Sequence, residues 1–274
     1  MASSLNRSPP LVKEHKIQIA AAANEEESRC FQLFHQAGSR SHVLLFAPGF
    51  MSCSLGKKAK YLKTYCGERD LDLVLYDPEG LGASKVPDFS STTLSHWTED
   101  CEASLGFIRD SWPTKKILLI GSSMGGNIAL RLAEKQSKTL WKLLLIAPSL
   151  DTAGPRMERT VRDEFTEEQK RDWDSGEKVA FDTLAGPMPF RKSFLEDVKK
   201  ASLSAVARLD IQCPVKILHG YQDDIVPYQG SLKLLEVIGS GTVDLLLRKD
   251  ADHSFSRKQD LDFMALVLDE MIKE

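Results

Sequence analysis

From residue 43 onward, short runs of apolar residues alternate with longer amphipathic stretches. Each run is four to six residues long, is rich in Leu, Ile and Val, and contains few polar residues. A strand that is buried on both faces of a parallel sheet has this pattern, because neither face meets water. The pattern therefore predicts strands at residues 43–47, 71–76, 116–120, 143–147, 215–218 and 243–247.

Before these runs, residues 15–20 and 30–34 alternate between apolar and polar positions, and the polar stretch 24–28 separates them. Such alternation indicates strands with one buried face, and turn residues between two such strands favour a hairpin. We therefore expect an antiparallel hairpin at one edge of the sheet.

The stretches between the runs repeat apolar residues at the spacing of one helix face. Examples are Tyr61, Leu62 and Tyr65; Trp97, Cys101, Leu105 and Ile108; Ile128, Leu130 and Leu132; and the apolar positions of residues 260–273. Helices that alternate with buried strands predict a mostly parallel, doubly wound α/β sheet with right-handed crossovers.

Residues 152–210 interrupt this alternation. They contain no run typical of a buried strand, they are highly charged, and capping-box spacings occur at Thr166…Gln169 and Ser193…Glu196. About 60 residues with few large apolar side chains make a poor independent core. We therefore expect a single α/β domain over residues 1–274, with residues 152–210 as a helical lid inserted within it.

The composition excludes several classes of protein. The chain has 36 Lys and Arg against 39 Asp and Glu, so its net charge of −3 offers no basic surface for nucleic acid. Its apolar runs are far shorter than the roughly 20 residues of a membrane-spanning helix. Residues 1–13 contain Arg7 and Lys13 but are too short for a clear transit peptide. We expect a cytoplasmic protein with no nucleic-acid partner and no integral membrane segment.

Cysteine usage argues against metal and disulfide chemistry. The five Cys residues are scattered, and no two form a C-x-x-C pair. Structural zinc sites and disulfide frameworks of small domains show regular Cys spacings that are missing here. We therefore expect no metal site and no disulfide framework.

Candidate chemistry begins at residues 121–125, which read Gly-Ser-Ser-Met-Gly. This is a G-x-S-x-G motif between a predicted buried strand and a predicted helix, which is the context of a nucleophile elbow. Ser123 is the expected nucleophile, exposed on a sharp turn. The amide of Met124, at the start of the helix, is the expected first donor to an oxyanion.

A serine hydroxyl needs a base and the base needs an orienting acid. Of the six histidines, His253 follows the last predicted strand, and loops at the carboxyl ends of parallel strands carry working groups. Asp223 follows the preceding strand and gives the order Ser, Asp, His. Its neighbour Asp224 is the alternative acid. His219, at the end of the same strand, is interpreted as a supporting or turn residue.

A second oxyanion donor is expected after the first long apolar run. Residues 47–51 read Ala-Pro-Gly-Phe-Met, so Phe50 can supply a backbone N–H and Gly49 gives the chain room to aim it. Residues 77–84, Asp-Pro-Glu-Gly-Leu-Gly-Ala-Ser, are interpreted as a structural turn, because their glycine spacing does not match a nucleotide-binding loop.

These motifs together resemble the α/β-hydrolase superfamily over nearly the whole chain. Residues 48–50, the Gly-Ser-Ser-Met-Gly-Gly elbow, residues 219–227 and residues 247–253 also resemble a narrower group, the mitochondrial acyl-glucuronide esterases that also act as palmitoyl-protein thioesterases. The resemblance implies Ser123 as nucleophile, Asp223 as acid and His253 as base. It also implies a mitochondrial location, although this chain has an N-terminal hairpin and no clear transit peptide.

The predicted activity is two-step acyl transfer without a metal or organic cofactor. Ser123 attacks an ester or thioester carbonyl, and water then releases the acid. The substrate is a small-molecule acyl ester or thioester, or an S-acylated protein. A general carboxylesterase or a monoacylglycerol-type lipase is the alternative enzyme, and a non-catalytic ligand-binding pseudo-hydrolase is the alternative from another class.

The insertion carries Arg156, Arg159, Arg162 and Arg191 among many acidic residues. These arginines could attract an anionic substrate such as a glucuronide. The interleaved acids favour the other interpretation, which is solvated surface charge.

Overall fold

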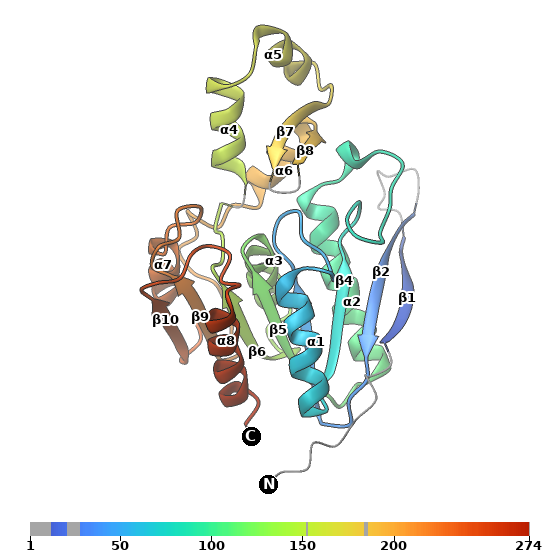
Figure 1. The fold of residues 1–274 in the computed structure, drawn as a ribbon, viewed down its shortest axis with the longest axis vertical. Helices are drawn as coiled ribbons and strands as arrows, with labels where there is room; N and C mark the ends of the chain where they lie inside the picture. Colours follow the sequence, from blue (N-terminus) through green and yellow to red (C-terminus); the bar gives the residue numbers. More distant parts are fainter. Residues whose placement is uncertain (1–11, 21–27, 152, 184–185, 274) are drawn as a thin grey trace.

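The computed structural model describes residues 12–20, 28–151, 153–183 and 186–273. Its centre is an eight-stranded sheet with the strand order β1-β2-β4-β3-β5-β6-β9-β10. Helices cover both faces of this sheet, and residues inserted between β6 and β9 form a separate layer at one end of the molecule (Figure 1). The predicted mostly parallel, doubly wound α/β sheet is confirmed.

The six predicted buried runs all form strands, and each pairs in parallel with its neighbour among them. They are β3 (His42–Ala47), β4 (Asp72–Asp77), β5 (Lys116–Ser122), β6 (Leu140–Ile146), β9 (Val215–Gly220) and β10 (Val243–Arg248). The helices outside the insertion are α1 (Lys57–Arg69), α2 (Leu94–Ser111), α3 (Met124–Lys135), α7 (Gln229–Val237) and α8 (Lys258–Met271), with a short 3₁₀ helix at Phe89–Ser91.

Strand β3 shows how one apolar run serves two cores. Val43 and Leu45 point into a core that also contains the apolar faces of α2 and α3. Leu44 and Phe46 point to the other face, where α1 and α8 pack. Every residue of β3 is buried, as the prediction of a strand covered on both faces requires.

Strand β10 differs from this prediction. It lies at the sheet edge, pairs with β9, and alternates between half-buried and exposed residues. An edge strand meets water along one side, so its apolar run Val243–Arg248 is only partly covered.

The N-terminal hairpin is confirmed and is longer than predicted. β1 (Val12–Ile19) pairs antiparallel with β2 (Arg29–Gln36), and β2 pairs antiparallel with β4. Most of the turn predicted at 24–28, and residues 1–11 of the segment considered as a transit peptide, lie outside the described residues.

The insertion is only partly helical, so the expectation of a helical lid needs correction. It contains α4 (Gly154–Asp163), α5 (Glu167–Asp174), β7 (Val179–Thr183), β8 (Gly186–Phe190) and α6 (Lys192–Lys200). β7 and β8 form a two-stranded antiparallel sheet. The insertion also has a small apolar cluster that its sequence does not predict, in which Phe165, Trp173 and Phe181 are buried and pack ring against ring.

The two predicted capping boxes have different outcomes. At the start of α5, Thr166 and Gln169 each bind the other's backbone amide, which confirms the first box. The second is wrong. α6 begins at Lys192 and Arg191 is its N-cap, so Ser193 is the second residue of the helix and does not cap it.

The insertion leaves and re-enters the domain at one place. The amide of Leu203 donates to the carbonyl of Leu150 at 2.8 Å. The side-chain amide of Asn127, in α3, donates to the carbonyls of Leu150 and Ala201 at 3.1 and 3.2 Å. Asn127 is fully buried, so both ends of the insertion are fixed to the helix that begins beside Ser123.

A buried ionic cluster joins the hairpin to α2. Arg29, at the start of β2, pairs with Glu79 at 3.2 Å, with Asp100 at 3.5 Å, and with Glu99. His96 Nδ1 lies 2.6 Å from the same Glu79 carboxylate. The cluster therefore connects β2, the turn after β4 and one face of α2.

Candidate active site

Ser123 occupies a strained turn between β5 and α3. Its backbone has φ 54° and ψ −117°, a conformation that a residue with a side chain rarely adopts. The turn is fixed from both sides, because the Ser123 amide donates to the carbonyl of Ile146 and the Ser123 carbonyl accepts from the amides of Gly126 and Ser149. The predicted nucleophile elbow therefore has the expected strand–turn–helix geometry.

The glycines of the motif are required by close backbone packing. A Cβ atom on Gly121 would lie 2.5 Å from the carbonyl oxygen of Gly125. A Cβ atom on Gly125 would collide with the carbonyl oxygens of Ala47 and Pro48. The elbow thus sits directly against the end of β3, where the predicted oxyanion loop begins.

The structure brings Ser123, His253 and Asp223 together in a chain of hydrogen bonds. Ser123 Oγ lies 3.0 Å from His253 Nε2, and His253 Nδ1 lies 2.8 Å from Asp223 Oδ2. Because Nδ1 faces a carboxylate, it carries the proton, and Nε2 accepts from the serine hydroxyl. Asp223 makes this contact, whereas the alternative acid, Asp224, is exposed.

The carboxylate of Asp223 is held in its ionised form. Burial raises its pKa, but hydrogen bonds from His219, from His253 and from the amide of Val226 outweigh burial and place the pKa well below its usual range. The amides of Ile225 and Val226 donate to Oδ1 at 3.0 and 2.7 Å. Asp223 can therefore hold the imidazole and stabilise its protonated form.

His219 is a second histidine on the same carboxylate. The ring is fully buried, and its Nε2 lies 3.1 Å from Asp223 Oδ2 and 2.9 Å from the carbonyl of Val226. Both neighbours are acceptors, so Nε2 carries the proton. Nδ1 then accepts from the hydroxyl of Ser231, 2.7 Å away in α7. His219 therefore supports Asp223, as expected from the sequence, and is itself held by Val226 and Ser231.

The predicted oxyanion loop lies against the elbow. A Cβ atom on Gly49 would lie 3.3 Å from Ser123 Cβ, so the loop passes close to the nucleophile. Among the described residues, neither the Phe50 amide nor the Met124 amide donates to a protein acceptor. Met124 is the first residue of α3, where amides lack helical partners and the helix dipole favours negative charge. Both amides are available to an oxyanion.

The turn at residues 77–84 supports this loop, as its structural interpretation requires. Asp77 is buried, and its carboxylate accepts from the amides of Ser54 and Ala83, both at 2.7 Å. Ser84 returns a hydrogen bond to the carbonyl of Asp77. The carboxylate thus ties the chain after Phe50 to the chain after β4.

The side chain of Phe50 connects the oxyanion loop to the insertion, a contact that was not predicted. Its ring stacks on Phe190 of β8, with centroids 5.7 Å apart and planes 24° apart. Phe194 of α6 and Trp97 of α2 complete the contact, at 6.2 and 6.1 Å. The insertion therefore packs directly on the residue that is predicted to supply the second oxyanion donor.

Two of the arginines considered for substrate attraction have carboxylate partners. Arg162 pairs with Asp163, and Arg191 pairs with Asp88 and Glu177. Arg156 and Arg159 are exposed on α4. This arrangement agrees with the interpretation as surface charge.

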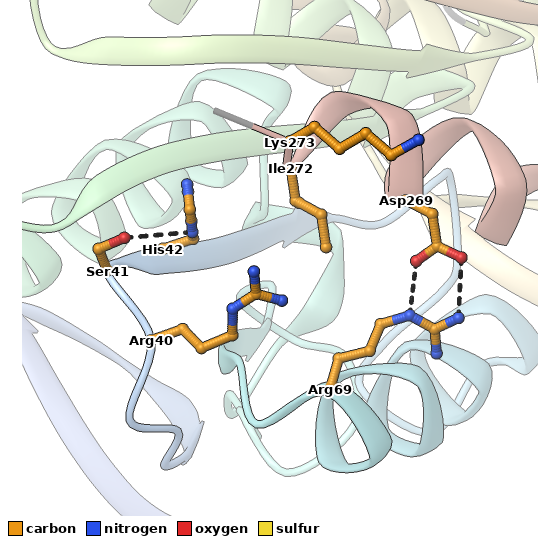
Figure 2. A pocket seen from close by; sticks show the side chains of 7 residues that line it. All are labelled: Arg40, Ser41, His42, Arg69, Asp269, Ile272 and Lys273. Carbon is orange, nitrogen blue, oxygen red and sulfur yellow. Dashed lines mark hydrogen bonds and ion pairs between the residues drawn. The ribbon is translucent and has the colours of Figure 1, made fainter.

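A cavity of about 690 Å³, whose lining side chains are drawn in Figure 2, lies near the start of β3 and β5. Its lining includes Arg40, His42, Lys273 and the Arg69–Asp269 ion pair, whose Nε–Oδ1 distance is 2.6 Å. His42 is the first residue of β3 and pairs with the first residue of β5, whereas Ser123 follows the end of β5. The length of β5, about 20 Å, therefore separates this cavity from the candidate active site.

Among residues 12–20, 28–151, 153–183 and 186–273, no group of three His, Cys, Asp or Glu side chains is arranged to hold a metal ion. Within the same ranges, no helix is both long and apolar enough to cross a bilayer.

Comparisons with known proteins show the family and the fold of the chain. The family profile described as Hydrolase_4, serine aminopeptidase S33, matches residues 39–260. The mitochondrial palmitoyl-protein thioesterase ABHD10 of Pongo abelii is 27% identical over 234 residues, which cover 85% of this chain and 74% of that protein.

Two solved structures share the fold. A protein from Agrobacterium vitis S4 aligns with a TM-score of 0.78 at 27% identity, over 96% of this chain and all of that one. Mouse alpha/beta hydrolase domain-containing protein 10 aligns with a TM-score of 0.73 at 24% identity, over 94% of this chain and 98% of that one.

Proposed function

The chain belongs to the hydrolase family described as serine aminopeptidase S33 and has the α/β-hydrolase fold, and from this premise we propose that Ser123, His253 and Asp223 form the catalytic triad of an esterase or thioesterase. The observation that carries the proposal is the unbroken hydrogen-bond chain from Ser123 Oγ through the His253 ring to Asp223 Oδ2. A serine, a base and an orienting acid in this order constitute an acyl-transfer site.

In the first step, His253 Nε2 takes the Ser123 proton as Oγ attacks the carbonyl carbon. The negative oxygen that forms accepts hydrogen bonds from the amides of Phe50 and Met124, and one such donor is typically worth about 10²–10³ in kcat. The imidazolium, stabilised by Asp223, then gives its proton to the departing oxygen or sulfur. The alcohol or thiol leaves, and the acyl group stays on Ser123.

In the second step, His253 takes a proton from water, and the resulting hydroxide attacks the acyl-enzyme carbonyl. The same two amides hold the second oxyanion. The imidazolium returns its proton to Ser123 Oγ as the carbon–oxygen bond to the enzyme breaks, and the carboxylic acid is released. The triad is restored without a metal or an organic cofactor.

The proposed substrate is an acyl thioester, either a small molecule or an S-acylated protein. The support for this choice is the likeness to relatives named palmitoyl-protein thioesterase over most of the chain. Those relatives are also named mitochondrial, so a mitochondrial location stands beside the cytoplasmic one expected from the sequence. Imaging of the full chain with a C-terminal tag distinguishes the two.

Replacement of the nucleophile tests the triad. In a Ser123→Ala variant, hydrolysis of p-nitrophenyl butyrate should fall at least about 10³-fold, because the attacking oxygen is lost. Fluorophosphonate labelling should disappear, while the melting temperature stays near that of the parent. Ser122→Ala is the matched control, since Ser122 is the neighbouring serine and lies in β5 outside the hydrogen-bond chain. Undiminished turnover in Ser123→Ala would contradict the assignment.

A comparison of substrates tests the rest of the proposal. Rates on an acyl-cysteine thioester, an acyl glucuronide and a simple ester separate a thioesterase from the alternative carboxylesterase or monoacylglycerol-type lipase. A thioester kcat/KM below that of the simple ester would favour the alternative. A parent protein that neither turns over any of the three nor reacts with fluorophosphonate would be a pseudo-hydrolase.

A further inference from the structure

Helix α1 begins directly after the oxyanion loop and reaches across to the loop that carries His253. The loop closes with a hydrogen bond from the Gly56 amide to the Cys53 carbonyl, and Gly56 is the N-cap of α1. Lys58, the second residue of the helix, extends its side chain to the other loop. Its Nζ donates to the carbonyl of Ser254 and to the hydroxyl of Ser256, the latter at 3.2 Å.

The chain around His253 is a tight loop, and among the described residues the other hydrogen bonds of its main chain are short-range or come from the Asp223 loop. Phe255 has a left-handed backbone with φ 43°, and its amide donates to Asp252 Oδ1. The amide of Gln222 donates to the carbonyl of Ala251 on the other side of His253. Lys58 adds a contact from the oxyanion-loop side, made by a residue that lies 196 positions earlier in the sequence than Ser254.

Lys58 is half-buried, and its ammonium group lies against the oxygens of Ser254 and Ser256. Desolvation lowers its pKa to about 8, although Asp252 and Asp260 oppose this by raising the pKa. Such a group is not a mobile surface lysine. It remains in place because the carbonyl oxygen of Ser254 and the hydroxyl of Ser256 replace water that it has lost.

We propose that Lys58 is a positioning residue, which fixes the main chain next to His253 relative to the oxyanion loop. Ser254 directly follows His253, so a cation bound to the Ser254 carbonyl restricts the placement of the imidazole. The same helix restrains Phe50 through the loop that ends at Gly56. Lys58 thereby keeps the base and the oxyanion donor at the correct distance from each other. This inference rests on the proposed function of Ser123 and His253.

The principal test is Lys58→Met, which keeps the aliphatic chain and removes the ammonium. Misplacement of a reacting group by a fraction of an ångström lowers catalysis without altering ground-state binding, so we expect kcat to fall about 10-fold and KM to stay within about 2-fold. Fluorophosphonate labelling should slow in the same proportion. Lys60→Met is the matched control, because Lys60 is exposed on the same helix, and it should behave like the parent.

Two further variants keep the inference testable if Lys58→Met folds poorly. Lys58→Arg retains a cation and should recover at least half of the lost kcat. Ser256→Ala removes one acceptor and should lower kcat about 2-fold with no change in melting temperature. Parent-like kcat in Lys58→Met, or parent-like kcat in both Ser256→Ala and a folded Lys58→Gln, would overturn the inference. An inactive parent protein would instead overturn the proposed function.

Discussion

Asp223 accepts hydrogen bonds from two histidines, and this places a buried ring behind the triad. His253 Nδ1 and His219 Nε2 lie 2.8 and 3.1 Å from the same oxygen, Oδ2. A carboxylate held by two ring N–H groups and two backbone amides has little freedom to rotate. The direction in which the His253 ring faces is therefore set partly by a residue that never approaches the substrate.

We expect His219→Asn to lower kcat about 10-fold and to leave KM within about 2-fold, because Asp223 loses a donor and can turn away from His253. Ser231→Ala should cost only about 2-fold, since the His219 ring keeps its contact with Asp223 and loses only the hydroxyl that donates to Nδ1. Steady-state kinetics with melting temperatures measure both effects. Equal kcat in the parent and in His219→Asn would show that the second histidine only fills space.

At the residue scale, the sequence allows the order Ser123, Asp223, His253 to be predicted, because each residue follows a recognisable apolar run. It also places His219 near Asp223. The partners of the His219 ring cannot be predicted in the same way. They depend on Ser231, which lies in α7, a helix that is not among those predicted from the sequence.

At the scale of elements, the insertion is more than a cover over the carboxyl ends of the strands. Phe190 of β8 and Phe194 of α6 pack on Phe50, and Phe190 also contacts Phe181 of β7. The aromatic contacts thus continue from inside the insertion to the oxyanion loop. A displacement of the insertion would be transmitted to the Phe50 backbone.

Two matched substitutions separate this coupling from simple loss of core packing. Phe190→Leu and Phe165→Leu both shrink the aromatic cluster, and each should reduce the free energy of unfolding by about 1–2 kcal/mol. Of these two residues, Phe190 contacts Phe50 and Phe165 does not, so only Phe190→Leu should also lower kcat, by about 3- to 10-fold. Chemical denaturation and steady-state kinetics give the two quantities. Equal kcat in the two variants would argue against the coupling.

The parallel strands could be predicted because burial on both faces leaves a continuous apolar run. The hairpin of β7 and β8 could not. β8 reads Gly-Pro-Met-Pro-Phe, and proline lacks the amide that a central strand donates. A short two-stranded sheet tolerates prolines along its outer edge, so the strand forms despite a sequence that argues against it.

At the scale of the whole molecule, the ionic cluster around Arg29 makes the stability of the domain depend on pH. Burial raises the pKa of Asp100 to about 7, and the negative charge of Glu79 adds to this, while the Glu79 amide, Arg29 and His96 oppose it. An unfolded aspartate loses its proton near pH 4, whereas the folded protein keeps this one until about pH 7. Between these values the folded state binds more protons, so Asp100 makes the free energy of unfolding fall as pH rises.

Asp100→Asn should remove this contribution, because the amide does not titrate and its oxygen can still accept from the Glu79 amide. The unfolding free energy of the variant minus that of the parent should therefore increase from pH 4.5 to pH 7.5. The slope should correspond to about one proton, which the parent takes up on folding and the variant does not. Urea unfolding across this range measures it. Asp110→Asn, an exposed position on the same helix, is the control and should follow the parent. A difference that stays constant with pH would mean that Asp100 is ionised throughout.

The insertion begins and ends at a single hydrogen bond, between the Leu203 amide and the Leu150 carbonyl. Because its two ends lie side by side, a segment of different length or sequence can be joined at the same two points without shifting β6 or β9. Natural exchange of this segment, or construction of chimaeras in the laboratory, can therefore change substrate preference while Ser123, Asp223 and His253 are inherited unaltered. Asn127, which binds the carbonyls of Leu150 and Ala201, marks where such a graft should be made.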